Sequence, residues 1–243
     1  MYHPFSVPET IKTSWYIFKK NFVTIIVYSV IAFILLIFLG ILIELVISPE
    51  TYGETMLFAI ILLIVQAYST LGLYKLIFTV IDSEYYEFEF KQVIPTFKMV
   101  ISYLGAVFPI AFVVTNYNIL VEFVEKHYSN FETVIKGAGD IAGLYIALRI
   151  LFFITFIVDD HSGPIESFKQ SFQLTKGYFL KILMILLVIL VLIYLPAKTS
   201  QYYPLVSLII IFTYPFVNII LAVTYRKLIY SHQDVDDDLT ETH

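Results

Sequence analysis

Paired lysines at helical spacing are the residues in this sequence with the clearest capacity to bind an anionic ligand. A pair seven residues apart occurs three times along the chain: Lys12 and Lys19, Lys91 and Lys98, and Lys169 and Lys176. Seven residues are about two helical turns, so both ammonium groups of a pair fall on one side of a helix. Each pair could hold an anionic lipid headgroup. It could also serve only to orient the chain in a membrane, which is the commoner role of such residues.

Polar side chains also fall inside long apolar segments, where they could line a path for a solute. They are Arg149, Asn116, Asn118 and Asn218. On insertion scales an arginine at the centre of a bilayer costs about 2.5 to 3.5 kcal/mol, so Arg149 should face a cavity, a partner or the membrane surface. The amides lie near Pro109 and Pro215. Kinked helices with facing amides could form a polar cavity, but ordinary interhelical packing explains the same residues.

The sequence holds no pattern typical of a catalytic or metal site. It has no cysteine, and its five histidines are scattered without the spacing that zinc ligands adopt. No glycine-rich phosphate loop and no nucleophile elbow occurs. We therefore predict a protein that is not an enzyme and carries neither metal nor cofactor. The acidic tail, 231–243, and a net charge of -5 argue against nucleic acid as a partner.

The apolar composition places all these residues in a membrane protein. Of the 243 residues, 59% are hydrophobic and 14% are charged, whereas soluble domains are about 25% charged. A helix needs about 20 apolar residues to cross a bilayer. Segments of this kind lie approximately at 22–47, 56–81, 99–121, 141–158, 178–195 and 203–225. The predicted fold class is an all-α bundle of six transmembrane helices, forming a single integral membrane domain over residues 1–243.

Lysine and arginine are unevenly distributed between the two sides of the membrane that these spans define. With an even number of spans both termini lie on one side, and that side carries most of the basic residues, whereas Lys126, Lys136 and Lys198 lie on the other. Cytoplasmic loops are the ones enriched in lysine and arginine, so both termini should be cytoplasmic. On the far side, apolar residues at helical spacing in 122–140 predict a helix lying on the outer surface of the membrane.

The segment that contains the first lysine pair, 8–22, has two further copies downstream, displaced by 79 and then by 78 residues. Each copy has a mainly apolar stripe with its lysines on one flank, which predicts an amphipathic helix at the cytoplasmic interface. Trp15 and Phe172 occupy the same place in the first and third copies. The middle copy contains Pro95, which should break its helix. The fold is thus predicted to consist of three parallel two-helix repeats, at about 8–85, 86–163 and 164–230.

A weaker pattern recurs toward the end of each repeat, where a basic residue precedes an acidic one. The pairs are Lys75 and Asp82, Arg149 and Asp159, and Arg226 and Asp234. Chance could also produce them. If the pattern is structural, it places Arg149 toward the cytoplasmic end of its span, at the same depth as Lys75.

The third copy carries a motif that resembles a known family. Residues 163–183 read GPIESFKQSFQLTKGYFLKIL and follow Val158, Asp159 and Asp160. The matching positions are Glu166, Ser171, Phe172, Lys176, Gly177 and Phe179, and in the first copy Glu9, Ser14, Trp15, Lys19 and Phe22. The segment is similar to the membrane domain found with glycerophosphoryl diester phosphodiesterases and to related six-span bacterial proteins of unknown function. The resemblance implies a six-span architecture in a bacterial inner membrane. It does not extend to the phosphodiesterase, which is a separate barrel domain too large for this chain.

Two functions of different classes are compatible with these residues. The first is a non-enzymatic protein that organises or handles membrane lipid, anionic lipid in particular, or a protein partner at the cytoplasmic leaflet. Its binding residues would be the six paired lysines together with Trp15 and Phe172. The alternative is a small transporter or channel with a polar path near Arg149, Asn116 and Asn218.

Overall fold

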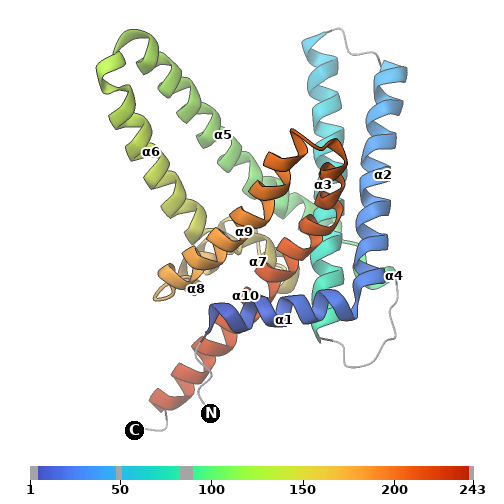
Figure 1. The fold of residues 1–243 in the computed structure, drawn as a ribbon, viewed down its shortest axis with the longest axis vertical. Coiled ribbons are helices and arrows are strands. Elements are labelled where there is room, and N and C mark those ends of the chain that lie inside the picture. Colours follow the sequence, from blue (N-terminus) through green and yellow to red (C-terminus); the bar gives the residue numbers. More distant parts are fainter. Residues whose placement is uncertain (1–4, 48–50, 83–89, 241–243) are drawn as a thin grey trace.

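The computed structural model describes residues 5–47, 51–82 and 90–240, and the regular elements in these ranges are all helical. In chain order they are α1 (Val7–Lys20), α2 (Phe22–Ile47), α3 (Tyr52–Asp82), α4 (Phe90–Val93), α5 (Phe97–His127), α6 (Ser129–Arg149), α7 (Phe153–Asp159), α8 (Pro164–Leu174), α9 (Phe179–Ser200), the 3-10 helix η1 (Pro204–Ile209) and α10 (Ile210–Thr240) (Figure 1).

Six segments of the described chain are long and apolar enough to cross a membrane. They are Phe22–Val46, Gly53–Asp82, Lys91–His127, Thr133–Asp159, Phe179–Ser200 and Leu205–Ser231. Each overlaps one of the predicted spans. For the described residues the prediction of an all-helical chain with six helices able to span a membrane is therefore confirmed, and the structure is consistent with a multi-pass membrane protein.

The spans are arranged as three helical hairpins. α2 packs against α3, α5 packs against α6, and α9 is joined to α10 through η1. In Figure 1 the α2–α3 and α5–α6 hairpins diverge from a common base, and the α9–α10 hairpin lies between them. Contacts among α3, α5, α7 and α10 hold the hairpins together at this base.

The far end of the α5–α6 hairpin differs from the prediction. The sequence predicts a separate surface helix over 122–140, but α5 runs on to His127 and α6 begins at Ser129. The chain turns at Tyr128, whose φ of -141° and ψ of 54° end α5. The apolar residues of this region belong to the ends of two consecutive long helices, so the prediction of one surface helix is wrong.

The best-buried side chains gather where the hairpins meet. Tyr74 of α3, Phe152 between α6 and α7, and Tyr225 of α10 are among the largest fully buried residues. The rings of Phe152 and Tyr225 lie 6.4 Å apart, and Phe156 packs edge-on against Tyr225 at 5.0 Å. Away from this core, the spans leave many leucine, isoleucine, valine and phenylalanine side chains exposed, as a lipid-facing surface requires.

Prolines set the bounds of the three short helices at the base. Pro8 and Pro164 lie in the first turns of α1 and α8, where the missing N–H is not needed. α4 ends at Val93 and α5 starts after Thr96, whose side chain caps it by accepting from the Met99 N–H. This break flanks Pro95, as the sequence predicts, because proline restricts the residue before it and cannot donate to the helix.

Candidate functional site

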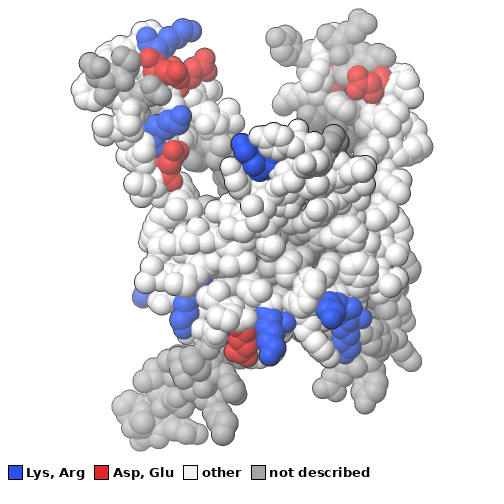
Figure 2. All heavy atoms as spheres, in the orientation of Figure 1, with Lys and Arg blue, Asp and Glu red and all other residues white. Residues whose placement is uncertain are grey.

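The six paired lysines are all exposed, and they lie on or next to the short helices at the base of the molecule. Lys12 and Lys19 lie on α1, Lys91 on α4, Lys98 in the first turn of α5, Lys169 on α8 and Lys176 just after α8. Figure 2 shows basic side chains in a band along the lower end of the molecule, at the level of α1 in Figure 1. The upper tip of the α5–α6 hairpin carries both signs of charge. The base is therefore the end with a surplus of visible positive charge.

Small hydroxyl residues, rather than the aromatic stripe, form the most deeply buried positions on α1. Thr10 and Ser14 are fully buried, whereas Trp15 remains 51% exposed. In α8 the fully buried residues Ser167 and Ser171 occupy the positions that match Thr10 and Ser14 in the sequence copies. Small side chains let membrane helices approach closely. The aromatic residue Trp15 is consequently left at the outer surface beside the lysines.

Ser171 connects α8 to the break between α6 and α7. Its hydroxyl donates to the Arg149 carbonyl at 2.8 Å and accepts from the Phe152 N–H at 3.1 Å. Both backbone groups are left without a helical partner where the fourth span changes direction. In hydrocarbon an unpaired backbone group costs several kcal/mol, so a side chain from a neighbouring helix stabilises the break.

Arg149 ends α6 and packs on an aromatic residue of α8. Its guanidinium carbon lies 5.0 Å from the centre of the Phe172 ring. Its Nε is buried and has no hydrogen-bond partner in the described part of the chain. Phe172 is half-buried, so it serves as a contact for Arg149 rather than as a freely exposed aromatic anchor.

The three amides predicted to line a polar path are satisfied within their own helices or exposed. Asn116 of α5 is exposed and donates to the Phe112 carbonyl at 2.8 Å, while Asn118 is also exposed. Asn218 of α10 is 8% exposed and donates to the Tyr214 carbonyl at 2.8 Å. Among the described residues, no hydrogen bond or ion pair joins Arg149 to any of these amides. Within the described residues these side chains are therefore not linked directly into one hydrogen-bonded network.

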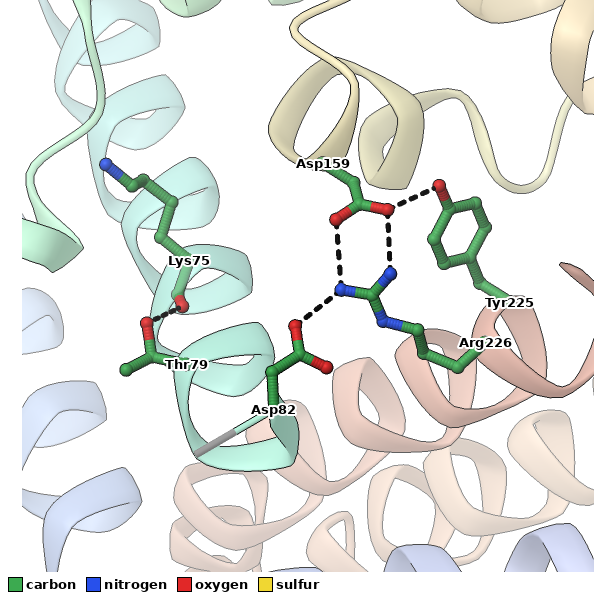
Figure 3. A network of polar contacts seen from close by, with 6 residues as sticks. All are labelled: Lys75, Thr79, Asp82, Asp159, Tyr225 and Arg226. Atoms are coloured by element: carbon green, nitrogen blue, oxygen red, sulfur yellow. Dashed lines mark hydrogen bonds and ion pairs between the residues drawn. The ribbon is translucent and has the colours of Figure 1, made fainter. Parts of the chain in front are cut away.

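A charge cluster of Arg226, Asp82 and Asp159 joins the three hairpins, as Figure 3 shows. Arg226 of α10 makes two hydrogen bonds to Asp159 at the end of α7, Nη1 to Oδ2 at 2.9 Å and Nη2 to Oδ1 at 3.0 Å. The same Nη2 lies 2.5 Å from Oδ2 of Asp82 at the end of α3. Tyr225 donates its hydroxyl to Oδ2 of Asp159 at 2.8 Å. The third hairpin is thus bonded to the last residues of the other two.

The surroundings of this charge cluster are partly apolar and carry an excess of negative charge. The Arg226 guanidinium lies 4.8 Å from the centre of the Phe78 ring. The side chains of Arg226 and Asp159 are each 19% exposed, whereas Asp82 is 50% exposed. One guanidinium therefore faces two carboxylates. Burial and the charge of Asp159 raise the pKa of Asp160, the next residue along the chain, although Arg226 opposes this shift.

None of the three charged residues of the cluster stands out as a site in the sequence alone. The signal that points to them is the recurrence of a basic and then an acidic residue near the end of each repeat. That pattern pairs Lys75 with Asp82 and Arg226 with Asp234, whose side chain lies outside the described part of the structure. The described bonds of Arg226 run instead to Asp82 and Asp159. Lys75 instead donates to the Ile94 carbonyl at 2.9 Å, next to the break at Pro95.

Two apolar grooves run along α2, one on each side of a contact between Tyr28 and Ser69. The larger, of about 570 Å³, lies between α2, α3 and the connection from α4 to α5. The smaller, of about 260 Å³, lies between α2, α3 and α10. Tyr28 and Ser69 line both, and the Tyr28 hydroxyl donates to the Ser69 carbonyl at 3.0 Å. This hydrogen bond between α2 and α3 separates the two grooves.

Comparison of the chain with protein-family models, with curated proteins and with solved structures finds no match. The proposed function therefore rests on the geometry and charge of the described residues.

Proposed function

We propose that this multi-pass membrane protein is a non-enzymatic protein of the bacterial inner membrane that binds and organises anionic lipid, or an acidic protein partner, at the cytoplasmic leaflet. The observation that carries the proposal is the set of exposed paired lysines on and beside α1, α4 and α8. Lysines at a membrane surface attract anionic lipids with about 1 kcal/mol each. The distribution of basic residues supports an orientation with both termini cytoplasmic.

Three parallel repeats, each with an amphipathic helix at the cytoplasmic interface, would present this basic face three times. The order of elements supports the proposal, because a short helix precedes two spans in α1–α3, in α4–α7 and in α8–α10. The matched burial of Thr10 and Ser14 with Ser167 and Ser171 supports it further. A relationship to the membrane domain found with glycerophosphoryl diester phosphodiesterases is part of the same proposal. Among the motif residues that suggest it, Ser171 has a structural role, because its hydroxyl bonds to the backbone at the break between α6 and α7.

The experiment compares lipid enrichment around the wild-type protein and a variant without four of the lysines. Lys12, Lys19, Lys169 and Lys176 are changed to Gln, and both proteins are placed in nanodiscs that contain phosphatidylglycerol and phosphatidylcholine. Native mass spectrometry then gives the ratio of the two lipids released with the protein. Since about 1 kcal/mol corresponds to about a fivefold change in an equilibrium constant, the variant should lose most of its phosphatidylglycerol enrichment.

The matched control changes the lysines at the opposite end of the spans. Lys126, Lys136 and Lys198 are replaced by Gln, which also lowers the positive charge but leaves α1 and α8 intact. This control should keep the enrichment of the wild type. An equal loss in both variants would mean that net charge alone sets the lipid shell, and an unchanged ratio in the first would refute lipid binding by these lysines.

A further inference from the structure

The larger groove beside α2 has the shape of a site for one lipid chain. Its walls are formed by apolar side chains, among them Val27, Ile31 and Leu35 of α2 and Val65 and Leu76 of α3. Its volume is about 570 Å³. Such a concave apolar surface, with few polar groups, is what an acyl chain requires.

The length of the groove matches one leaflet of a bilayer. Along α2 it extends from Val23, one residue after the start of the helix, to Leu35 in the middle of the span. Twelve residues of helix rise about 18 Å, and half of a hydrocarbon core is about 15 Å. The groove therefore begins at the basic end of the molecule and ends near the mid-plane. A chain from the opposite leaflet would not enter it lengthwise.

A lysine stands at the basic end of the groove. Lys75 is half-buried on α3, next to the lining residue Leu76, and its ammonium donates to the carbonyl of Ile94, another lining residue, at 2.9 Å. Figure 3 shows its side chain running from α3 toward this connection. An ammonium group has three N–H donors, and Ile94 takes one of them. The exposed Lys91 and Lys98 flank the same connection in the sequence.

We propose that the groove between α2 and α3 holds an acyl chain of one anionic phospholipid of the cytoplasmic leaflet, whose headgroup phosphate is bound by Lys75. This inference rests on the proposed orientation and lipid function, and it names one position at which a lipid is held in place. The smaller groove is less suited to this role, because its residues, such as Ser29, Leu36 and Gln66, lie deeper along the spans and farther from the basic end.

The test counts the lipids that remain on the protein after release from nanodiscs of phosphatidylglycerol and phosphatidylcholine. Wild-type protein should retain one phosphatidylglycerol more strongly than the rest. Val27→Trp fills the larger groove, and Phe33→Trp places a tryptophan in the smaller one. These two side chains are similarly exposed, at 50% and 48%, so the pair is matched in exposure, although Phe33→Trp adds less volume. Val27→Trp should lower occupancy of the retained lipid at least tenfold, and Phe33→Trp should leave it unchanged.

Lys75 is tested separately for its charge. Lys75→Gln should abolish the preference for phosphatidylglycerol over phosphatidylcholine in the retained position, whereas Lys75→Arg should keep it. Thermal unfolding in detergent shows whether a variant has lost binding because it has lost its fold. If Lys75→Gln is unfolded, Lys75→Met takes its place, because it keeps an unbranched side chain of similar length without the positive charge.

Three results would overturn the proposal. The first is retention of phosphatidylglycerol at wild-type levels in Val27→Trp. The second is equal retention of both lipids by the wild type. The third is a second copy of the chain in the groove in place of the lipid.

Failure of this inference can be told apart from failure of the proposed function. The variant with Lys12, Lys19, Lys169 and Lys176 changed to Gln should lose general enrichment but keep the single retained lipid. If Val27→Trp has no effect while that variant loses enrichment, the groove proposal falls and the lipid function stands. If the retained lipid is present and enrichment does not depend on the four lysines, the groove stands and the surface proposal falls.

Discussion

Arg226 is the residue on which the junction of the three hairpins depends most directly. It is the cation that faces both Asp82 and Asp159, and removal of one partner from a buried ion pair costs about 3–5 kcal/mol because the other charge is left uncompensated. Because the cluster is partly exposed, Arg226→Ala should lower the free energy of unfolding by an amount near the lower end of this range, about 3 kcal/mol. The expected result is a lower midpoint of thermal unfolding in detergent.

Two further variants separate charge from geometry in this prediction. Arg226→Lys keeps the positive charge but cannot form the two parallel bonds to Asp159, so its loss should be smaller. Lys227→Ala removes the neighbouring base, which pairs with Glu9 at 3.2 Å on a surface where Glu9 is 62% exposed. Exposed pairs of this kind contribute less than about 1 kcal/mol. A loss in Lys227→Ala as large as that in Arg226→Ala would contradict the role given to the cluster.

At the scale of elements, the joint between α6 and α7 depends on a side chain from another helix. Ser171→Ala leaves the Arg149 carbonyl and the Phe152 N–H without their partner, which should cost about 1–3 kcal/mol. Ser14→Ala is the matched control, because Ser14 is equally buried but donates to Thr10 within its own helix at 2.8 Å. Its cost should be smaller than that of Ser171→Ala. Unfolding in detergent measures both, and equal losses would argue against the joint.

The six spans and the broken middle helix could be predicted from the sequence, whereas the partners of individual side chains could not. Span length and the effect of Pro95 on the backbone are local properties, so they can be read directly from the sequence. The contact of Ser171 with the break between α6 and α7 cannot, because no sequence pattern marks that break. The bond between Arg226 and Asp159 joins residues 67 positions apart. The lysine pairs are visible through their spacing, but which side of α1 is buried depends on the close approach of α10, which hydropathy alone does not encode.

At the scale of the whole molecule, the proposed orientation can be measured directly because the chain contains no cysteine. Single cysteines replace Lys12 or Lys169 at the basic end and Lys136 or Lys198 at the other. A membrane-impermeant maleimide should label the second pair in spheroplasts and the first pair in inverted vesicles, as the excess of positive charge on the cytoplasmic side requires. Labelling of Lys12→Cys in intact spheroplasts would reverse the orientation and remove the basis for a cytoplasmic lipid site.

The position of Arg226 in the chain has a consequence for biosynthesis. Asp82 and Asp159 are both translated before Arg226, and they belong to hairpins that enter the membrane earlier. Each carboxylate therefore lacks the Arg226 guanidinium as a partner until the last span has been inserted. At that stage α3 can already pack against α5 and α7, but the ion pairs that link Asp82 to Asp159 form only once Arg226 is in place. A chain that stops short of Arg226 would therefore leave both carboxylates uncompensated.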